Sequence, residues 1–430
     1  MDAFRELGRS LKYHARLIEA RTKRKLSKAR FIAVTGSSGK TSTVKLLSRI
    51  LEVNHKVKSQ SDNNSEKSAI GLLQTMKRDD EFAVLEAGAG APGRLEQIAS
   101  VYNPDISIVT LVAIEHYSAF RKLESIAHEK GAIIRALPSN GLALLNYDVP
   151  EVRAMSGQSA APVKYFGCTG GDYRACDLKT LPDGRLSFRI EYGPSSLLLD
   201  TRLIGEHNWL GVTAAVSCAL ELGVDPETIA RCVAEFEPVP GRMSLHKIPQ
   251  GPTFILDTCK APFHSMTLPF TTLSKIECSR KRIIIGSISD YPGNPKPKYR
   301  DVYRAARQVA DEVMMVGEHA HRVNALPEDL ASGRFLVFSG VRQVFDHVLR
   351  TSMAGEVILV KSSQNLHLER IMLAFIEDVQ CWPDQCGNKI SCAKCGHFRQ
   401  PFTEHSGKSK RTRAPFIRAR PRNSPANATE

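Results

Sequence analysis

One stretch decides the fold, Phe31-Ile32-Ala33-Val34-Thr35-Gly36-Ser37-Ser38-Gly39-Lys40-Thr41-Ser42-Thr43. The four apolar residues at its start predict a short buried strand, and the Gly-Ser-Ser-Gly sequence predicts a tight turn. Apolar residues then recur at helical spacing, at Val44, Leu47 and Leu51, which predicts a helix after the turn. Strand, glycine-rich turn and helix in this order are the context that a phosphate-binding loop requires.

The turn itself has the composition of a nucleotide-binding loop. Its backbone N–H groups and the helix N-terminus attract phosphate, the lysine reaches the terminal phosphates, and the threonine hydroxyl binds Mg²⁺. The general pattern begins with a glycine where this chain has Val34, so the loop is the shorter form T-G-x-x-G-K-T. The expected nucleotide-binding residues are Gly36, Ser37, Ser38, Gly39, Lys40 and Thr41. The alternative is a purely structural turn.

Charge is concentrated at the two ends of the chain. The net charge is +14, and residues 1–30 carry ten Lys or Arg against three Asp or Glu, whereas residues 406–430 carry seven against one. Residues 31–405 are therefore nearly neutral, which excludes a basic nucleic-acid-binding domain there. The ends are expected to be a solvated helix and a disordered tail, the alternative being contact with nucleic acid or an anionic membrane. The sequence shows no membrane span or signal peptide.

The order of predicted elements divides the 430 residues into several regions. Residues 1–30 are a basic helix, and 31–240 alternate strands and helices, which predicts an α/β domain with a parallel sheet. Within that domain, residues 160–204 predict a small β subdomain. A Pro-Gly linker at 238–241 precedes a second, Rossmann-like α/β domain at 241–378. A cysteine-rich segment (379–400) and a disordered basic tail (401–430) follow.

Several motifs occur in an order that resembles the Mur ligase superfamily. They lie at 35–41, 85–89, 115–116, 129–133, 205–208, 240–242, 256–258 and 360–363. The likeness runs from about residue 30 to about 375. It implies ATP-dependent formation of an amide bond in the cytoplasm. The γ-phosphate would pass to a substrate carboxylate, and an amine would attack the acyl phosphate. The substrates would be small molecules or peptides, such as amino acids or cell-wall-type peptides.

The resemblance also implies roles for individual residues. Thr41 and Glu86 would bind one Mg²⁺ and His116 a second, while Lys130 matches a lysine that many family members carbamylate. The other implied positions are Asn208 at the adenine, Arg242 at the phosphates, Asp257 at the ribose, and Asn64, Lys260 and Lys361 toward the substrate. Lys40, His116, Lys130 and Arg242 would form the catalytic set.

The chain departs from the family pattern in its substrate half. Only thirty residues precede the first strand, so no UDP-binding N-terminal domain is expected. Gly211 replaces an asparagine of the adenine site, and Lys361-Ser362-Ser363-Gln364 replaces Lys-Gly-Ser-Arg, which removes a guanidinium able to grip a carboxylate. Two other functions therefore stay open, a P-loop ATPase or kinase and a degenerate nucleotide-binding interaction protein.

Four of the ten cysteines lie close together near the C-terminus. Cys381, Cys386, Cys392 and Cys395 fall within fifteen residues, and His397 follows them. The Cys-x-x-Cys pair has the spacing of a tetrahedral Zn²⁺ site, so a structural zinc is expected. An iron–sulfur site and unligated cysteines are the alternatives. The other six cysteines are scattered, as reduced thiols of an intracellular protein are.

Overall fold

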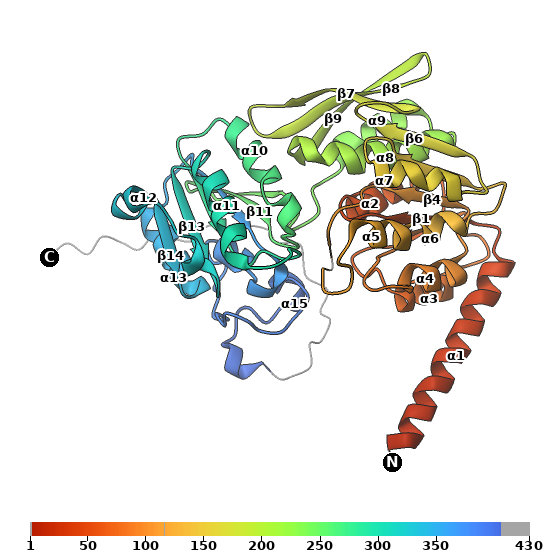
Figure 1. Cartoon of the computed structure of the whole chain (residues 1–430), viewed down its shortest axis with the longest axis horizontal. Helices are drawn as coiled ribbons and strands as arrows, with labels where there is room; N and C mark the ends of the chain where they lie inside the picture. Colours follow the sequence, from red (N-terminus) through yellow and green to blue (C-terminus); the bar gives the residue numbers. More distant parts are fainter. Residues whose placement is uncertain (1, 116, 406–430) are drawn as a thin grey trace. The chain divides into compact units, whose positions relative to one another are not determined.

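The structure is a computed structural model, and it describes residues 2–115 and 117–405. The chain forms two compact units, one of residues up to 180 with 185–237, and one of 181–184 with residues from 238 onward. Each unit is built around one sheet (Figure 1). No helix in the described ranges combines the length and apolar character needed to cross a membrane.

The first unit contains a nine-stranded sheet in the order β2-β3-β1-β4-β5-β6-β7-β8-β9. Strands β2 to β7 are parallel, and β8 and β9 extend the sheet in antiparallel fashion. The strands at 160–204, predicted as a small β subdomain, thus extend this same sheet. The strands are β1 (Arg30–Thr35), β2 (Val57–Gln60), β3 (Phe82–Glu86), β4 (Ile106–Val109), β5 (Leu142–Asn146), β6 (Val163–Gly167), β7 (Tyr173–Thr180), β8 (Arg185–Tyr192) and β9 (Ser195–Ile204).

Helices cover both faces of this sheet because its central strands are apolar on both sides. In β1, Phe31 and Ala33 face one core and Ile32 and Val34 the other, as alternation along a strand requires. One face carries α2 (Lys40–Leu51), α8 (Trp209–Glu221) and α9 (Pro226–Glu235). The other carries α3 (Glu66–Thr75), α4 (Arg94–Tyr102), α5 (Leu123–Lys130) and α6 (Ala132–Arg135). Short turns are α7 (Pro150–Arg153), η1 (Ala154–Gln158) and η2 (Glu206–Asn208).

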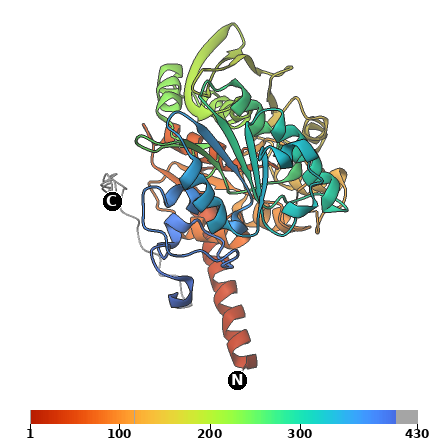
Figure 2. The same cartoon turned by 90° about the vertical axis from the view of Figure 1, so that its left-hand side faces the viewer.

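The basic helix α1 (Asp2–Leu26) is anchored through its second half. Ala20 is buried in the core beside α3 and α4, and Arg24 pairs with Asp105 at 3.0 Å. In both views the N-terminal end of α1 projects away from the rest of its unit (Figures 1 and 2).

The second unit contains a six-stranded sheet in the order β10-β11-β15-β12-β13-β14, in which only β10 runs antiparallel. Its strands are β10 (Ser244–Lys247), β11 (Thr253–Asp257), β12 (Lys281–Ile285), β13 (Glu312–Val316), β14 (Phe335–Phe338) and β15 (Val357–Lys361). Its longer helices are α10 (Leu268–Lys275), α11 (Pro295–Arg307) and α13 (Val341–Thr351). Short elements are η3 (Phe263–Ser265), η4 (Ala320–Arg322), α12 (Pro327–Ala331), η5 (Gln364–Leu366), α14 (Glu369–Leu373), α15 (Cys392–Cys395) and η6 (Phe402–Glu404).

The cysteine-rich segment packs on one face of this second sheet. Val379, Cys381, Cys392 and Phe398 belong to the same buried cluster as residues of β11, β12, β15 and α13. The segment is therefore part of the folded second unit. The predicted fold class, two α/β regions with parallel sheets, is confirmed. The predicted disordered tail (401–430) is ordered at its start, where residues 402–404 form η6, and its residues 406–430 lie outside the described residues.

Candidate active site

The predicted phosphate-binding loop lies at the carboxyl end of β1, a central strand paired with β3 and β4. Gly39, at φ 83°, leads into α2. Gly36 lies at φ 150°, and a Cβ there would lie 1.9 Å from Thr110 Oγ1. Both positions therefore require glycine. Ser37 fixes the loop to the residues after β4, because its N–H donates to Leu111 O at 2.7 Å and its hydroxyl donates to Ala113 O at 3.0 Å.

Lys40 is buried with no negatively charged partner. Its side chain is 7% exposed, and its ammonium donates to the carbonyl of Gly36. Among the described residues, no carboxylate lies within ion-pair distance of this ammonium. A buried cation without an anion is unfavourable, so this ammonium is a candidate partner for a bound anion.

Thr41 and Glu86 place two oxygen groups side by side at the loop. The Thr41 hydroxyl donates to Glu86 Oε2 at 2.8 Å, and both residues are buried. Glu86 ends β3, and the register pairs it with Val34 of β1, which explains why a carboxylate 45 residues away meets the loop. Hydroxyl and carboxylate oxygens are the ligands that Mg²⁺ prefers, so this pair fits the expected metal.

Asn64 lies against the turn that follows β3. A Cβ at Gly88 would lie 2.2 Å from Asn64 Nδ2, so this close approach depends on glycine. Asp62 N–H also donates to Glu86 Oε2 at 3.1 Å. The polar loop 61–65 thus borders the Thr41–Glu86 pair.

Lys130 forms a buried ion pair that the sequence did not predict. Its Nζ lies 2.5 Å from Glu115 Oε1, and the side chains are 0% and 6% exposed. The neighbouring Glu129 has a structural role, since it accepts N–H bonds from Gly93 and Leu95 at 2.7 Å at the start of α4. Glu115 was missed as a site residue, although the Glu-His motif contained it. His116 lies outside the described residues.

Asn208 precedes α8 in the first unit. Its amide group donates to the carbonyls of Ile204 at 2.8 Å and Gly205 at 3.3 Å, so the amide fixes the turn after β9. Gly211 lies close to the phosphate-binding loop: a Cβ there would lie 3.3 Å from Ser42 Cβ and 3.4 Å from Gly39 O. A larger residue at position 211 would press on the loop.

In the second unit, Asp257 and Lys361 end two adjacent parallel strands. The register aligns them directly, and Lys361 Nζ lies 2.6 Å from Asp257 Oδ2. The lysine is 3% exposed and the carboxylate 16%. Lys361 also donates to the carbonyl of Lys260 at 2.8 Å, and the Lys260 side chain is exposed. These three predicted residues therefore lie together.

Arg242 is held near the same strand end by its neighbour Gly241. The carbonyl of Gly241 accepts N–H bonds from Thr258 at 3.0 Å and Cys259 at 3.2 Å. Gly241 has φ 74°, and a Cβ there would lie 2.9 Å from Cys259 Sγ. The Pro-Gly-Arg turn thus packs on the residues that follow Asp257.

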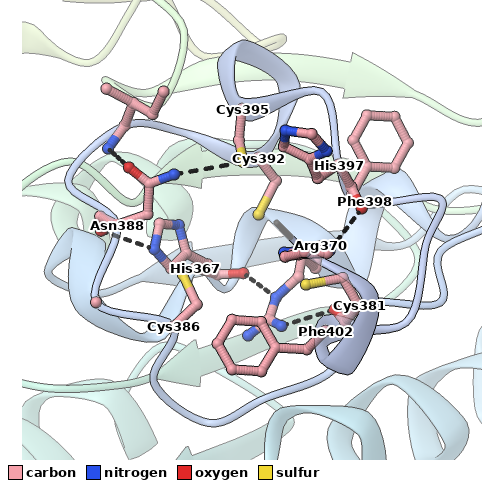
Figure 3. Close-up of a pocket in the computed structure, with 13 residues that line it drawn as sticks. His367, Arg370, Cys381, Cys386, Asn388, Cys392, Cys395, His397, Phe398 and Phe402 are labelled. Atoms are coloured by element: carbon pink, nitrogen blue, oxygen red, sulfur yellow. Dashed lines mark hydrogen bonds between the residues drawn. The ribbon is translucent and has the colours of Figure 1, made fainter. Parts of the chain in front are cut away.

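The four clustered cysteines line one cavity in the second unit (Figure 3). Burial raises the pKa of the Cys381 and Cys392 thiols above the ordinary value. His367, Glu369 and Arg370, from the turn after β15, are buried beside them. Sequence reasoning missed these three residues, because nothing in their spacing connects them with the cysteines.

Comparisons with known proteins agree with this architecture. Residues 34–219 match the Mur ligase middle domain family. The UDP-N-acetylmuramoyl-tripeptide--D-alanyl-D-alanine ligase of Escherichia coli K12 is 26% identical over 363 residues, covering 82% of this chain and 78% of that one. The Bacillus subtilis enzyme of the same name is 25% identical, covering 81% and 76%.

Solved structures show the same fold. MurF ligase from Thermotoga maritima, in complex with ADP, has a TM-score of 0.74 at 22% identity and covers 84% of this chain and 83% of its own. FolC from E. coli, also in complex with ADP, has a TM-score of 0.61 at 17% identity, covering 84% and 93%. The predicted resemblance and the predicted enzyme class are thereby confirmed: the chain resembles the Mur ligase superfamily of ligases, and its residues 34–219 match the middle domain of that superfamily.

Proposed function

We propose that the protein is an ATP- and Mg²⁺-dependent ligase that joins a carboxylate to an amine. The observation that carries the proposal is Lys40, a buried ammonium with only a carbonyl partner, beside the Thr41–Glu86 pair. A cation of this kind is suited to phosphate charge. Named relatives that align with more than three-quarters of their own length are ligases, which favours amide formation over simple ATP hydrolysis.

In the proposed reaction, the γ-phosphoryl group of ATP passes to a substrate carboxylate and ADP leaves. The nitrogen of the amine then attacks the carbonyl carbon, the bond to phosphate breaks, and the amine loses a proton. The products are an amide, ADP and phosphate. The carboxylate belongs to an amino acid, a peptide or a cell-wall-type peptide. Phosphoryl transfer depends mainly on the positioning of the reacting groups and on stabilisation of their charge.

Residues 31–240 would bind ATP and the metal. The backbone N–H groups of 36–39 and the Lys40 ammonium would hold the phosphates, and Asn208 would lie at the adenine. Thr41, Glu86 and His116 would hold Mg²⁺, which when bound neutralises charge on the phosphoryl oxygens. We assign unmodified Lys130 a positioning role, which it performs through its ion pair with Glu115. Its carbamylation would bring a second carboxylate-like group beside Glu115, which is favourable only with a cation next to both.

Residues 241–378 would supply the remaining groups. Arg242 is assigned to the phosphates, Asp257 to the ribose, and Lys260 and Lys361, with Asn64 of the first unit, to the substrate. These assignments rest on the family resemblance. They rest also on the common location of Asp257, Lys260 and Lys361 at the carboxyl ends of the adjacent strands β11 and β15.

The test is a product analysis with the full chain, ATP, Mg²⁺ and a panel of amino acids and peptides. ATP turnover is expected to be slow alone and to rise when the correct carboxylate and amine are both present. ADP and phosphate should form in step with a new amide, and hydroxylamine should trap the acyl phosphate as a hydroxamate. Formation of AMP, or of a phosphorylated product without an amide, would replace this proposal with a P-loop kinase or ATPase.

A further inference from the structure

A cavity of about 440 Å³ in the second unit collects potential metal ligands that the ligase reaction does not use. Cys381, Cys386, Cys392 and Cys395 all line it, from a segment that follows the last strand of the sheet (Figure 3). Cys381 and Cys392 are buried, and the other two are half-buried. Four thiols converging on one cavity are a ligand set for a soft or borderline metal ion.

The cysteine segment is closed on itself by backbone hydrogen bonds. The N–H groups of Gln380 and Cys381 donate to the carbonyl of Phe398, at 2.9 and 3.1 Å. Between Cys381 and Phe398 lies the short helix α15. It is capped by Ser391, whose hydroxyl accepts the N–H of Lys394, and by Gly396 at φ 76°. This loop brings Cys381 back to the Cys392–Cys395 pair.

Glu369 connects the turn after β15 to this loop. Its Oε1 accepts the N–H of Cys392 at 3.0 Å and lies 3.2 Å from His367 Nδ1. Its Oε2 is buried and has no hydrogen-bond partner. A buried carboxylate oxygen without a donor is costly, and one ligand atom each of Glu369, His367 and Cys392 lie within 4.8 Å of one another. A cation bound at Cys392 would stabilise this oxygen.

The two ring nitrogens of His367 each face an oxygen atom of a neighbouring residue. Its Nδ1 faces Glu369 Oε1 and its Nε2 faces the carbonyl of Asn388 at 3.1 Å. These two oxygen atoms hold the imidazole ring in place beside the thiols. The four thiols suffice for a tetrahedral zinc site without a further ligand.

Arg370 and Asn388 both lie beside the cysteines. Arg370 is 1% exposed, and its guanidinium donates to the carbonyls of Cys381 at 2.7 Å and Pro383 at 2.8 Å. It has no carboxylate partner among the described residues, so its positive charge can balance sulfur ligands of a bound metal. Asn388 Nδ2 donates to Cys395 Sγ at 3.3 Å, and hydrogen bonds of this kind orient metal-bound ligands.

We propose that Cys381, Cys386, Cys392 and Cys395 bind one structural Zn²⁺. The ion closes the segment 379–405 on itself and so fastens it, through the Cys392–Glu369 hydrogen bond, to the turn 364–370. The four sulfur atoms do not all lie within 4.8 Å of one another, whereas a zinc ion holds each sulfur at about 2.3 Å. Metal binding therefore draws the loop inward. This proposal is independent of the ligase reaction, because the cavity involves none of the residues assigned to ATP.

The first test is the metal content of the full chain, purified under reducing conditions. We expect about one zinc per chain, lost in Cys392→Ser and in Cys395→Ser. Cys278→Ser is the matched control, since Cys278 is half-buried in the same unit but does not line the cavity, and it should keep its zinc. Absence of zinc, or iron with acid-labile sulfide, would overturn the proposal.

The second test uses the wild-type ligands, so it does not depend on whether the serine variants fold. It counts the thiolate ligands and measures whether metal binding changes the conformation of the segment 379–405. Co²⁺ exchanged into the wild-type chain should give the charge-transfer and visible spectrum of tetrahedral coordination by four thiolates. A spectrum of three thiolates would overturn the assignment. Trp382 stacks on Phe345 at a centroid distance of 5.3 Å, so in a Trp209→Phe background it reports on the segment. Chelation should change its emission, and zinc should restore it; an unchanged emission would contradict the fastening role.

Discussion

Two regions of the first unit each bury a lysine, and they treat its charge in opposite ways. Lys130 is completely buried and lies 2.5 Å from a carboxylate of Glu115. Lys40, at the phosphate-binding loop, is almost as buried but donates only to a carbonyl. Removing one partner of a buried ion pair is destabilising, whereas a buried cation without a counter-charge would be stabilised by a bound anion. We therefore expect substitution of Lys40 to affect ligand binding and substitution of Lys130 to affect stability as well.

The largest expected effect is on activity, in Lys40→Ala. ATP turnover should fall by at least about a hundredfold, because a charge directed at the phosphates is removed. The free energy of unfolding should change little or increase, because an uncompensated buried cation is also removed. The measurements are ATP turnover and denaturant unfolding.

Arg49→Ala is the control for this change. Arg49 lies on the same helix, α2, but its side chain is 57% exposed and pairs with Glu235 at the surface. Such pairs contribute little, so turnover should stay near wild type. Near-normal ATP use by Lys40→Ala would refute the nucleotide-binding interpretation.

The second effect is on stability, in Lys130→Ala. Removing one partner of a buried ion pair costs about 3–5 kcal/mol. The double variant Lys130→Met with Glu115→Gln should recover much of this loss in denaturant unfolding, because no buried charge is left without a partner. A wild-type free energy of unfolding in the single variant would mean that the ion pair does not stabilise the fold, and the comparison with Lys40 would fail.

The sequence predicted the loop region well because its signals are local. The strand, the turn and Lys40-Thr41 are contiguous, and a carboxylate at the end of a neighbouring parallel strand is expected to lie beside such a loop. The position of Glu86 beside the loop could therefore be predicted from the sequence, and its register with Val34 explains that position. The strands of 160–204 were also recognised, but not that they extend the same sheet, because pairing between β6 and β7 depends on tertiary packing.

Contacts set by long-range packing could not be predicted. Lys361 and Asp257 are separated by 104 residues, and they meet only because β15 inserts between β11 and β12. His367, Glu369 and Arg370 precede the cysteines in the chain and carry no zinc-binding spacing. Their role follows from the way the segment 379–405 folds back over the turn after β15.

The smallest expected effect tests whether the second unit's pair resembles Lys130 or Lys40. Lys361 is buried and paired, but its partner Asp257 is 16% exposed, so water can solvate the carboxylate left behind in Lys361→Ala. The loss of unfolding free energy should therefore be about 1–3 kcal/mol, smaller than in Lys130→Ala.

Asp257→Asn removes the negative charge and keeps the cation. The more deeply buried Lys361 ammonium then has only uncharged oxygen partners, among them the carbonyl of Lys260 at 2.8 Å. Lys361 would then resemble Lys40, a buried cation with a carbonyl partner, and the second unit should gain affinity for anions such as inorganic phosphate, measurable by calorimetry against wild type. Equal stability losses in Lys361→Ala and Lys130→Ala would mean that exposure of the partner carboxylate does not set the cost, and no gain of phosphate binding in Asp257→Asn would limit the anion-site argument to the phosphate-binding loop.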